Sequence, residues 1–312
     1  MVQRRIWRAF QFVAGALLVG VAVRSLALNW QSLRAQPIEW QLSPQWIAAS
    51  VLVVFASYAM LIEAWRRVVL SMGEPLPFMT ATRIWFLASL GKYVPGKVWA
   101  VAGAAVLAQR SGVDPAVAVA GALVLQVLAL ASGAAVISLT ARDAFQTVGQ
   151  GAEPIAGVVI VLSLLGVATL TSQPALDRIG RLLPSSWPTL RAIAPTMVAV
   201  AFVANVIAWC GYGLALLLLA RGLLPGVALN LPQAVGVFTC SYLAGFLALF
   251  APGGLGPRES VFLLLLAGDI GLKPAAALAI ASRLLLTATE VLPAIPLLFR
   301  RDAPNPPSVR EA

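Results

Sequence analysis

Two stretches of this sequence place glycine, proline and charged residues in the middle of apolar runs. The later stretch reads FAPGGLGPRES (residues 250–260). Four of its residues suit a tight reversal of the backbone: Pro252, Gly253, Gly254 and Gly256. Pro257 suits the first position of a following helix, so Arg258 and Glu259 fall in its first turn. Free backbone N–H groups at a helix N-terminus, with a guanidinium beside them, can hold a phosphate.

The earlier stretch, GKYVPGKVW, contains the same parts. Lys92 and Lys97 flank Pro95 and Gly96, as charged residues flank the later break. Two further residues belong to this predicted site: Tyr93 and Arg110. Glycine and proline are common in membrane helices, and flanking charges can snorkel to the interface, so one break alone has an equally good structural explanation. Two breaks with matched charges favour an anion-binding site.

A third set of polar residues lies in the last apolar run. Arg283, Thr287 and Glu290 are spaced i, i+4 and i+7, which places them on one face of a helix. A charge deep in a membrane span is costly and usually faces the protein interior with a partner. The alternative is a purely structural ion pair of Arg283 with Glu290 or Glu259.

Several residues near these sites are better explained by the membrane–water interface. Tyr93, Trp85 and Trp99 are more typical of the aromatic belt of a membrane protein than of a sugar-stacking site. Glu63, beside Trp65, is also interpreted as an interfacial residue. Tyr93 therefore has two interpretations, as a site residue and as a belt residue.

Other chemistry lacks the residues it needs. The sequence contains no histidine, which excludes His-based catalysis and imidazole metal ligands. Its aspartates are isolated and form no D-x-D motif: Asp114, Asp143, Asp177, Asp269 and Asp302. Cys210 and Cys240 lie inside apolar segments and are interpreted as small core residues. We therefore expect no metal, no cofactor and no enzymatic activity.

The amino-acid composition indicates that these residues lie in a membrane protein. Of the 312 residues, 60% are hydrophobic and only 11% are charged, too few to cover a soluble protein of this length. The formal net charge is +10, but the basic residues lie between apolar runs, where they meet anionic headgroups. We expect membrane lipids as partners and no nucleic acid.

The apolar runs predict an all-α, polytopic membrane bundle with about six full spans and two broken, re-entrant hairpins. The spans are expected at residues 6–28, 44–65, 115–140, 154–170, 195–220 and 274–299, and the broken regions at 78–110 and 231–267. We expect one membrane domain over residues 1–301 and a disordered cytoplasmic tail over residues 302–312.

Arginines collect at alternate ends of these runs, for example at Arg66 and Arg67, at Arg178 and Arg181, and at Arg300. Because cytoplasmic loops are enriched in basic residues, this pattern predicts a multi-pass protein of the inner membrane with both termini in the cytoplasm.

The two broken regions look like copies of one unit. Residues 78–140 and 231–299 each contain a half-helix, a Pro-Gly break, a second half-helix and an Ala-rich span. Three expected spans separate the two regions, so they would enter the membrane from opposite sides. Such inverted repeats are typical of transporters that build a central site from discontinuous helices.

The motifs LGKYVPGKVWAVAG, PGGLGPRES and ASRLL resemble those of the lysylphosphatidylglycerol synthase transmembrane-domain family. The resemblance covers about residues 6–299. It implies a flippase-like inner-membrane protein that moves a lipid or a lipid-linked sugar between leaflets. Fused relatives carry a soluble aminoacyl-transferase domain, which we do not expect here, so the synthase activity does not carry over.

These observations together favour a lipid translocator. We expect Lys92, Lys97 and Arg258 to receive an anionic headgroup, of a phospholipid or of a polyprenyl lipid, with Arg283 and Glu290 lining the site. One alternative is a non-transporting partner of membrane enzymes that make lipids or envelope glycans. Another is a polyprenyl-phosphate transferase, which would need an acidic cluster that the sequence does not show.

Overall fold

The computed structural model describes residues 41–93, 98–140, 161, 165–181, 192–248 and 251–299. Within these ranges the chain is helical with no strand, so the all-α prediction is confirmed. Several predictions fall outside the described residues: the span at 6–28, most of the span at 154–170, the tail at 302–312, and Pro95, Gly96 and Lys97.

Four described helices are long and apolar enough to cross a membrane. They are α3 (Pro44–Ser71), α6 (Pro115–Thr140), α10 (Pro195–Leu223) and α13 (Leu272–Phe299). These helices have 26 to 29 residues, so each is about 40 Å long at a rise of about 1.5 Å per residue. The prediction for the second span ended too early, because α3 continues to Ser71 and holds Arg66 and Arg67 within the helix.

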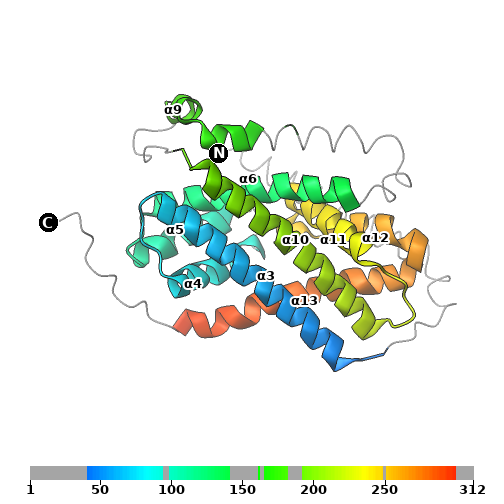
Figure 1. The fold of residues 1–312 in the computed structure, drawn as a ribbon. Coiled ribbons are helices and arrows are strands. Elements are labelled where there is room, and N and C mark those ends of the chain that lie inside the picture. The colour runs from blue at the N-terminus through cyan, green and yellow to red at the C-terminus, as the bar shows by residue number, and fades with distance from the viewer. Residues whose placement is uncertain are drawn as a thin grey trace, which may run out of the picture.

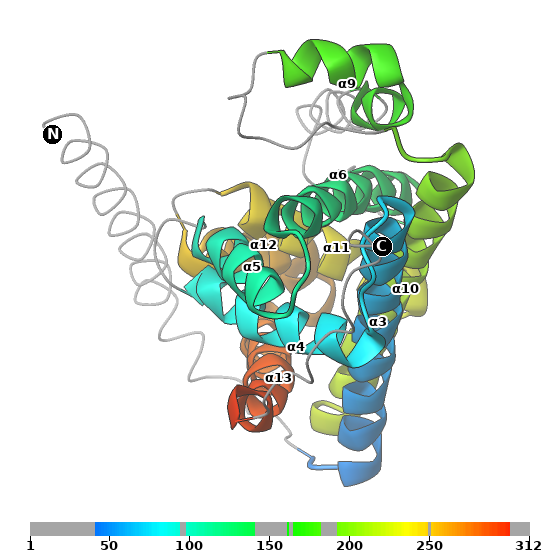
Figure 2. The ribbon, with the colours of Figure 1, turned by 90° about the vertical axis from the view of Figure 1, so that its left-hand side faces the viewer.

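Helices α3 and α10 lie side by side and run in opposite directions (Figures 1 and 2). Small residues permit this packing, since a Cβ at Gly211 of α10 would lie 2.4 Å from the Ser57 hydroxyl of α3. Gly213, two residues further along and on another face of α10, meets Val235 of α11 in the same way, since its Cβ would lie 2.3 Å from the Val235 side chain. α10 therefore joins the first long helix to the second broken region.

Two units of the chain share one order of elements. The first contains α4 (Phe78–Ser89), η1 (Leu90–Tyr93) and α5 (Val98–Arg110), followed by α6. The second contains α11 (Leu231–Leu247), η2 (Pro252–Gly254) and α12 (Pro257–Ile270), followed by α13. Figure 1 shows α6 and α13 running in opposite directions, which agrees with an inverted arrangement.

The short helices of these units do not span a bilayer singly. α4 and α5 have 12 and 13 residues, or about 18–20 Å, against a hydrocarbon core of about 30 Å. At each break, the segments before and after the break pack closely against each other. A Cβ at Gly91 of η1 would lie 2.5 Å from the backbone nitrogen of Ala100, and a Cβ at Gly254 would lie 2.9 Å from the Gly245 Cα.

The second break has the predicted backbone. Gly253, Gly254 and Gly256 have φ of 57°, 72° and 92°, and Pro257 begins α12, so Arg258 and Glu259 lie in its first turn. Positive φ strains any residue with a Cβ, which is why glycine stands at these positions.

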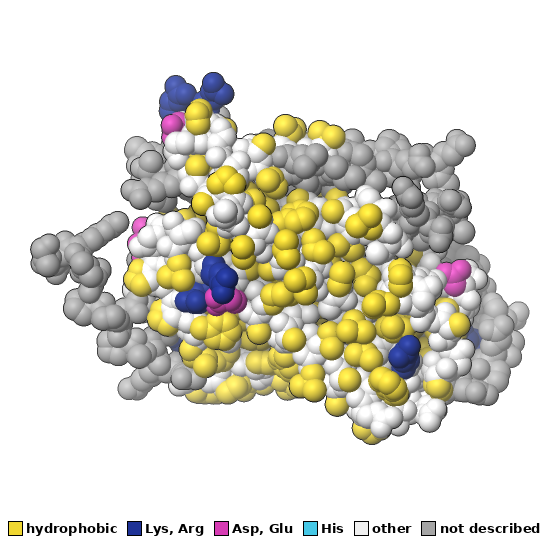
Figure 3. Space-filling model, in the orientation of Figure 1, with side chains coloured by type: hydrophobic (Ala, Val, Ile, Leu, Met, Phe, Trp, Pro, Cys, Tyr) yellow, Lys and Arg dark blue, Asp and Glu magenta, His cyan; other side chains and the backbone are white. Residues whose placement is uncertain are grey.

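The surface suits an apolar solvent. Figure 3 shows hydrophobic side chains over most of the face it views, with Lys and Arg side chains toward the two ends. α9 (Gln173–Gly180), the C-terminal end of α3 and the C-terminal end of α13 lie at the same end of the bundle (Figure 1).

Candidate functional site

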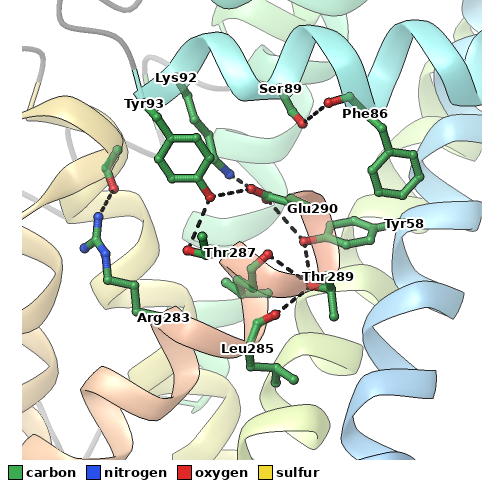
Figure 4. A network of polar contacts seen from close by, with 12 residues as sticks. Tyr58, Phe86, Ser89, Lys92, Tyr93, Arg283, Leu285, Thr287, Thr289 and Glu290 are labelled. Carbon is green, nitrogen blue, oxygen red and sulfur yellow. Dashed lines mark hydrogen bonds and ion pairs between the residues drawn. The ribbon is translucent and has the colours of Figure 1, made fainter. Parts of the chain in front are cut away.

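The carboxylate of Glu290 stands at the centre of a polar cluster inside the bundle (Figure 4). It accepts from Lys92 Nζ at 2.5 Å, from the Tyr93 hydroxyl at 2.8 Å and from the Tyr58 hydroxyl at 3.2 Å. These donors come from η1 and α3, while Glu290 lies 18 residues into α13, about 27 Å from its start. The Glu290 side chain is 8% exposed, so it is a buried carboxylate whose charge is balanced by Lys92.

A second ion pair ties α13 to the other break. The Arg283 guanidinium pairs with Glu259 of α12, and its Nη2 donates to the Gly253 carbonyl at 3.0 Å. Of the two structural partners expected for Arg283, the structure shows Glu259.

One backbone donor at the start of α12 is already bound by a side chain. Glu259 Oε2 accepts from the Gly256 N–H at 2.8 Å, so the protein's own carboxylate holds a backbone donor that the sequence analysis left free for a phosphate. For the Gly256 N–H that expectation is wrong, because a glutamate three residues after the N-cap residue reaches back to cap the helix.

The two breaks meet at Tyr93. A Cβ placed on Gly253 would lie 3.5 Å from the Tyr93 ring, and the Tyr93 hydroxyl lies within hydrogen-bond distance, 3.3 Å, of Thr287 Oγ1. Tyr93 is half-buried and contacts both breaks, which favours its interpretation as a site residue. Trp99 is 53% exposed, whereas the Trp85 ring packs 6.4 Å from that of Trp65.

Arg258 has a different environment from the other cations. It is 8% exposed, and its Nη2 donates to Ser282 Oγ at 3.1 Å. Its guanidinium carbon lies 5.4 Å from the Phe238 ring centre and 5.5 Å from that of Tyr242, both on α11. Within the described residues it forms no ion pair with a carboxylate.

A row of aromatic rings connects Arg258 with the Glu290 cluster. Ring centres lie 6.0 Å apart for Tyr58 and Tyr212, 5.3 Å for Tyr212 and Phe238, and 5.9 Å for Phe238 and Tyr242. With Tyr93, this row brings all four tyrosines of the chain to the site.

Four residues of the site were not predicted from the sequence: Tyr58, Tyr212, Phe238 and Tyr242. A signal was present for three of them, since each is a single tyrosine within an apolar run. A buried tyrosine hydroxyl needs a polar partner, which a lipid tail does not supply.

Not every predicted residue joins the cluster. Arg110 is exposed at the far end of α5, 12 residues after Val98, or about 18 Å along the helix. Pro252 begins η2, and Gly254 packs against Gly245 of α11. Glu63 pairs with Arg66 and Arg67 on its own helix, as expected of a residue outside the site.

Among the described residues, the charged centre consists of five side chains: Lys92, Arg258, Glu259, Arg283 and Glu290. These three cations and two carboxylates leave a surplus of one positive charge. Lys92, Glu259 and Arg283 keep 31%, 23% and 19% of their side-chain surface exposed, so the cluster is reachable. The described residues hold no group of three His, Cys, Asp or Glu side chains suited to a metal ion. The arrangement therefore suits an anion with a polar surround.

Fold and site together define a class: a helical, multi-spanning membrane protein whose two broken helices meet at a buried charged centre. The sequence pattern of the family described as Lysylphosphatidylglycerol synthase TM region matches residues 9–294. The match covers most of the chain, and the protein belongs to this family. It is an integral membrane protein with a lipid-related role. A search of curated proteins finds no match.

Proposed function

We propose that this protein moves a lipid with a polar headgroup between the two leaflets of the inner membrane. The observation that carries the proposal is the buried charged centre at which two broken helices meet one face of α13. Irregular backbone at membrane depth is tolerated where protein or a polar cavity satisfies it, and transporters place their substrates there.

The ion pairs suggest how a headgroup is received. Lys92 and Arg283 each hold a carboxylate in the resting arrangement, and a phosphate entering the centre competes with Glu290 and Glu259 for these cations. Both pairs anchor to α13, so exchange at either one loosens the contact between a break and this helix. The apolar tails remain in the surrounding lipid, where the helices expose hydrophobic side chains.

Orientation is part of the proposal. Because the arginine-bearing ends of α3 and α9 lie at one end of the bundle, together with the C-terminal end of α13, we place that end and both termini in the cytoplasm. The protein acts as a translocator and not as an enzyme, with a phospholipid or a polyprenyl lipid as cargo.

A leaflet-exchange assay tests the function. The purified protein is placed in phosphatidylcholine liposomes with trace fluorescent phosphatidylglycerol, phosphatidylcholine or polyprenyl phosphate, and dithionite then bleaches the label in the outer leaflet. We expect the protein to move an anionic lipid from the inner to the outer leaflet, where dithionite bleaches its label. Lys92→Met and Arg283→Gln should each slow this exchange by about tenfold or more, because each removes one charged hydrogen bond to the headgroup.

The control is Arg67→Gln, which breaks a helix-surface pair with Glu63 where the Arg67 side chain is 54% exposed. It should exchange lipid at the wild-type rate. Wild-type protein that exchanges no lipid at all would contradict the proposal and favour a non-transporting partner of lipid-synthesising enzymes.

A further inference from the structure

Among the described residues of the charged centre, Arg258 is the cation that forms no ion pair with a carboxylate. Lys92 and Arg283 are balanced by Glu290 and Glu259, whereas the described contacts of Arg258 are Ser282 and two aromatic rings. Uncompensated charge inside a membrane protein is costly, and such residues mark sites of function. The surplus positive charge of the centre therefore belongs to Arg258.

The neighbouring glutamate does not serve as its partner. Glu259 follows Arg258 directly in α12, but its two carboxylate oxygens are engaged by Arg283 and by the Gly256 N–H. Adjacent residues of a helix point in different directions, which explains how neighbours of opposite charge stay apart. An anion at Arg258 must come from elsewhere.

The rings around Arg258 orient its guanidinium. Phe238 and Tyr242 are four residues apart on α11, and their rings are stacked with an interplanar angle of 19°. Contact with these rings stabilises the cation while the hydrogen bond to Ser282 uses only one N–H group. Tyr212 and Tyr242 also bring hydroxyl groups to this aromatic row.

We propose that Arg258, held by Phe238 and Tyr242, binds the phosphodiester group of the cargo and sets the charge that the site accepts. This inference rests on the proposed function, and it adds Arg258 to Lys92 and Arg283 as the cation that holds the phosphodiester once the headgroup has entered the centre. The guanidinium fork matches two phosphate oxygens, which an ammonium group cannot do. One surplus positive charge suits a phosphodiester with a single negative charge better than a phosphomonoester with a higher charge.

Titration calorimetry on the full chain in detergent tests this assignment. The probes are dihexanoyl phosphatidylglycerol, dihexanoyl phosphatidic acid and inorganic phosphate. We expect the phosphatidylglycerol to bind most tightly. Arg258→Gln should abolish binding, and Arg258→Lys should weaken it by about tenfold, the loss of one charged hydrogen bond.

The matched control is Arg221→Gln. Arg221 also stacks on an aromatic ring, that of Trp46 at 5.7 Å, but it lies at the end of α10 away from the charged centre. This variant should bind phosphatidylglycerol as the wild type does. If Arg258→Gln does not fold, the folded Arg258→Lys protein decides the question, since unchanged binding there overturns the role of the guanidinium.

Three results overturn the inference: wild-type binding by Arg258→Gln, tighter binding of phosphatidic acid, or equal binding of inorganic phosphate, which would indicate a free-phosphate site. The leaflet-exchange assay separates this inference from the function. If wild type and Arg258→Gln exchange lipid equally, the function stands and the role of Arg258 fails. If Arg258 binds phosphatidylglycerol but no exchange occurs, the function fails and the role of Arg258 stands.

Discussion

Glu290 is the residue of the site with the most hydrogen-bond partners among the described contacts of its charged side chains. Its carboxylate lies inside the bundle with one cation and two tyrosine hydroxyls as donors, which come from two separate segments, η1 and α3. A buried pair of this kind contributes little net stability, but removing one partner leaves the other charge unbalanced. Replacing Glu290 would leave the Lys92 charge without a counter-charge inside the bundle, so the pair stabilises the contact between η1 and α13.

We expect Glu290→Gln to lower the free energy of unfolding by about 3 kcal/mol, because Lys92 is left without its counter-charge. The double variant Lys92→Met with Glu290→Gln should lose less than Glu290→Gln alone. Thermal unfolding of the three proteins in detergent measures both effects. Equal stability of the single and double variants would show that the Lys92–Glu290 pair does not govern this contact.

At the scale of elements, the breaks depend on glycine at places where the backbone comes close to a neighbour. Gly254 has φ of 72° and packs against Gly245 of α11, and a Cβ at Gly245 would in turn lie 3.0 Å from the Arg258 Cβ. The geometry of the break thus determines where α12, and with it Arg258, stands relative to the aromatic rings of α11.

Gly254→Ala should cost about 2–3 kcal/mol of stability, because it adds a contact at 2.9 Å to an unfavourable φ. Gly73→Ala is the matched control, since Gly73 has φ of 93° but nothing within 4 Å of an added Cβ. Its cost should be about 1 kcal/mol, from the backbone alone. Chemical or thermal unfolding compares the two, and similar losses would mean that the close packing of Gly254 is unimportant.

At the scale of the molecule, α13 is the common wall of the site. It carries Glu290 to the first break and Arg283 to the second, one helix face serving both units. The opposite directions of α6 and α13 agree with an inverted arrangement of the two units (Figure 1), and Tyr93 of the first break lies beside Gly253 of the second.

Cysteine labelling tests the proposed orientation. Cys210 and Cys240 are first replaced by alanine, and a single cysteine is then placed at Arg178 on α9 or at Gly226 after α10, both exposed and at opposite ends of the bundle. A membrane-impermeant maleimide should label position 226 in spheroplasts and position 178 only in inside-out vesicles. Labelling of both positions from one side would contradict the arrangement.

Local patterns in the sequence determined much of this protein. Apolar run length gave the helices, because a chain in lipid must satisfy its backbone internally. Glycine and proline predicted the positive-φ break and the start of α12, and the i, i+7 spacing placed Arg283 and Glu290 on one face.

Only the tertiary structure decided which charge meets which. Lys92 pairs with Glu290 across 198 positions of the chain, Arg283 takes Glu259 instead of Glu290, and Arg258 is left to two aromatic rings. Helical periodicity determines the face on which a side chain lies, but a partner is chosen by the distance between elements far apart in sequence. The same reason explains why lone tyrosines in apolar runs were missed, since their role appears only when the helices pack together.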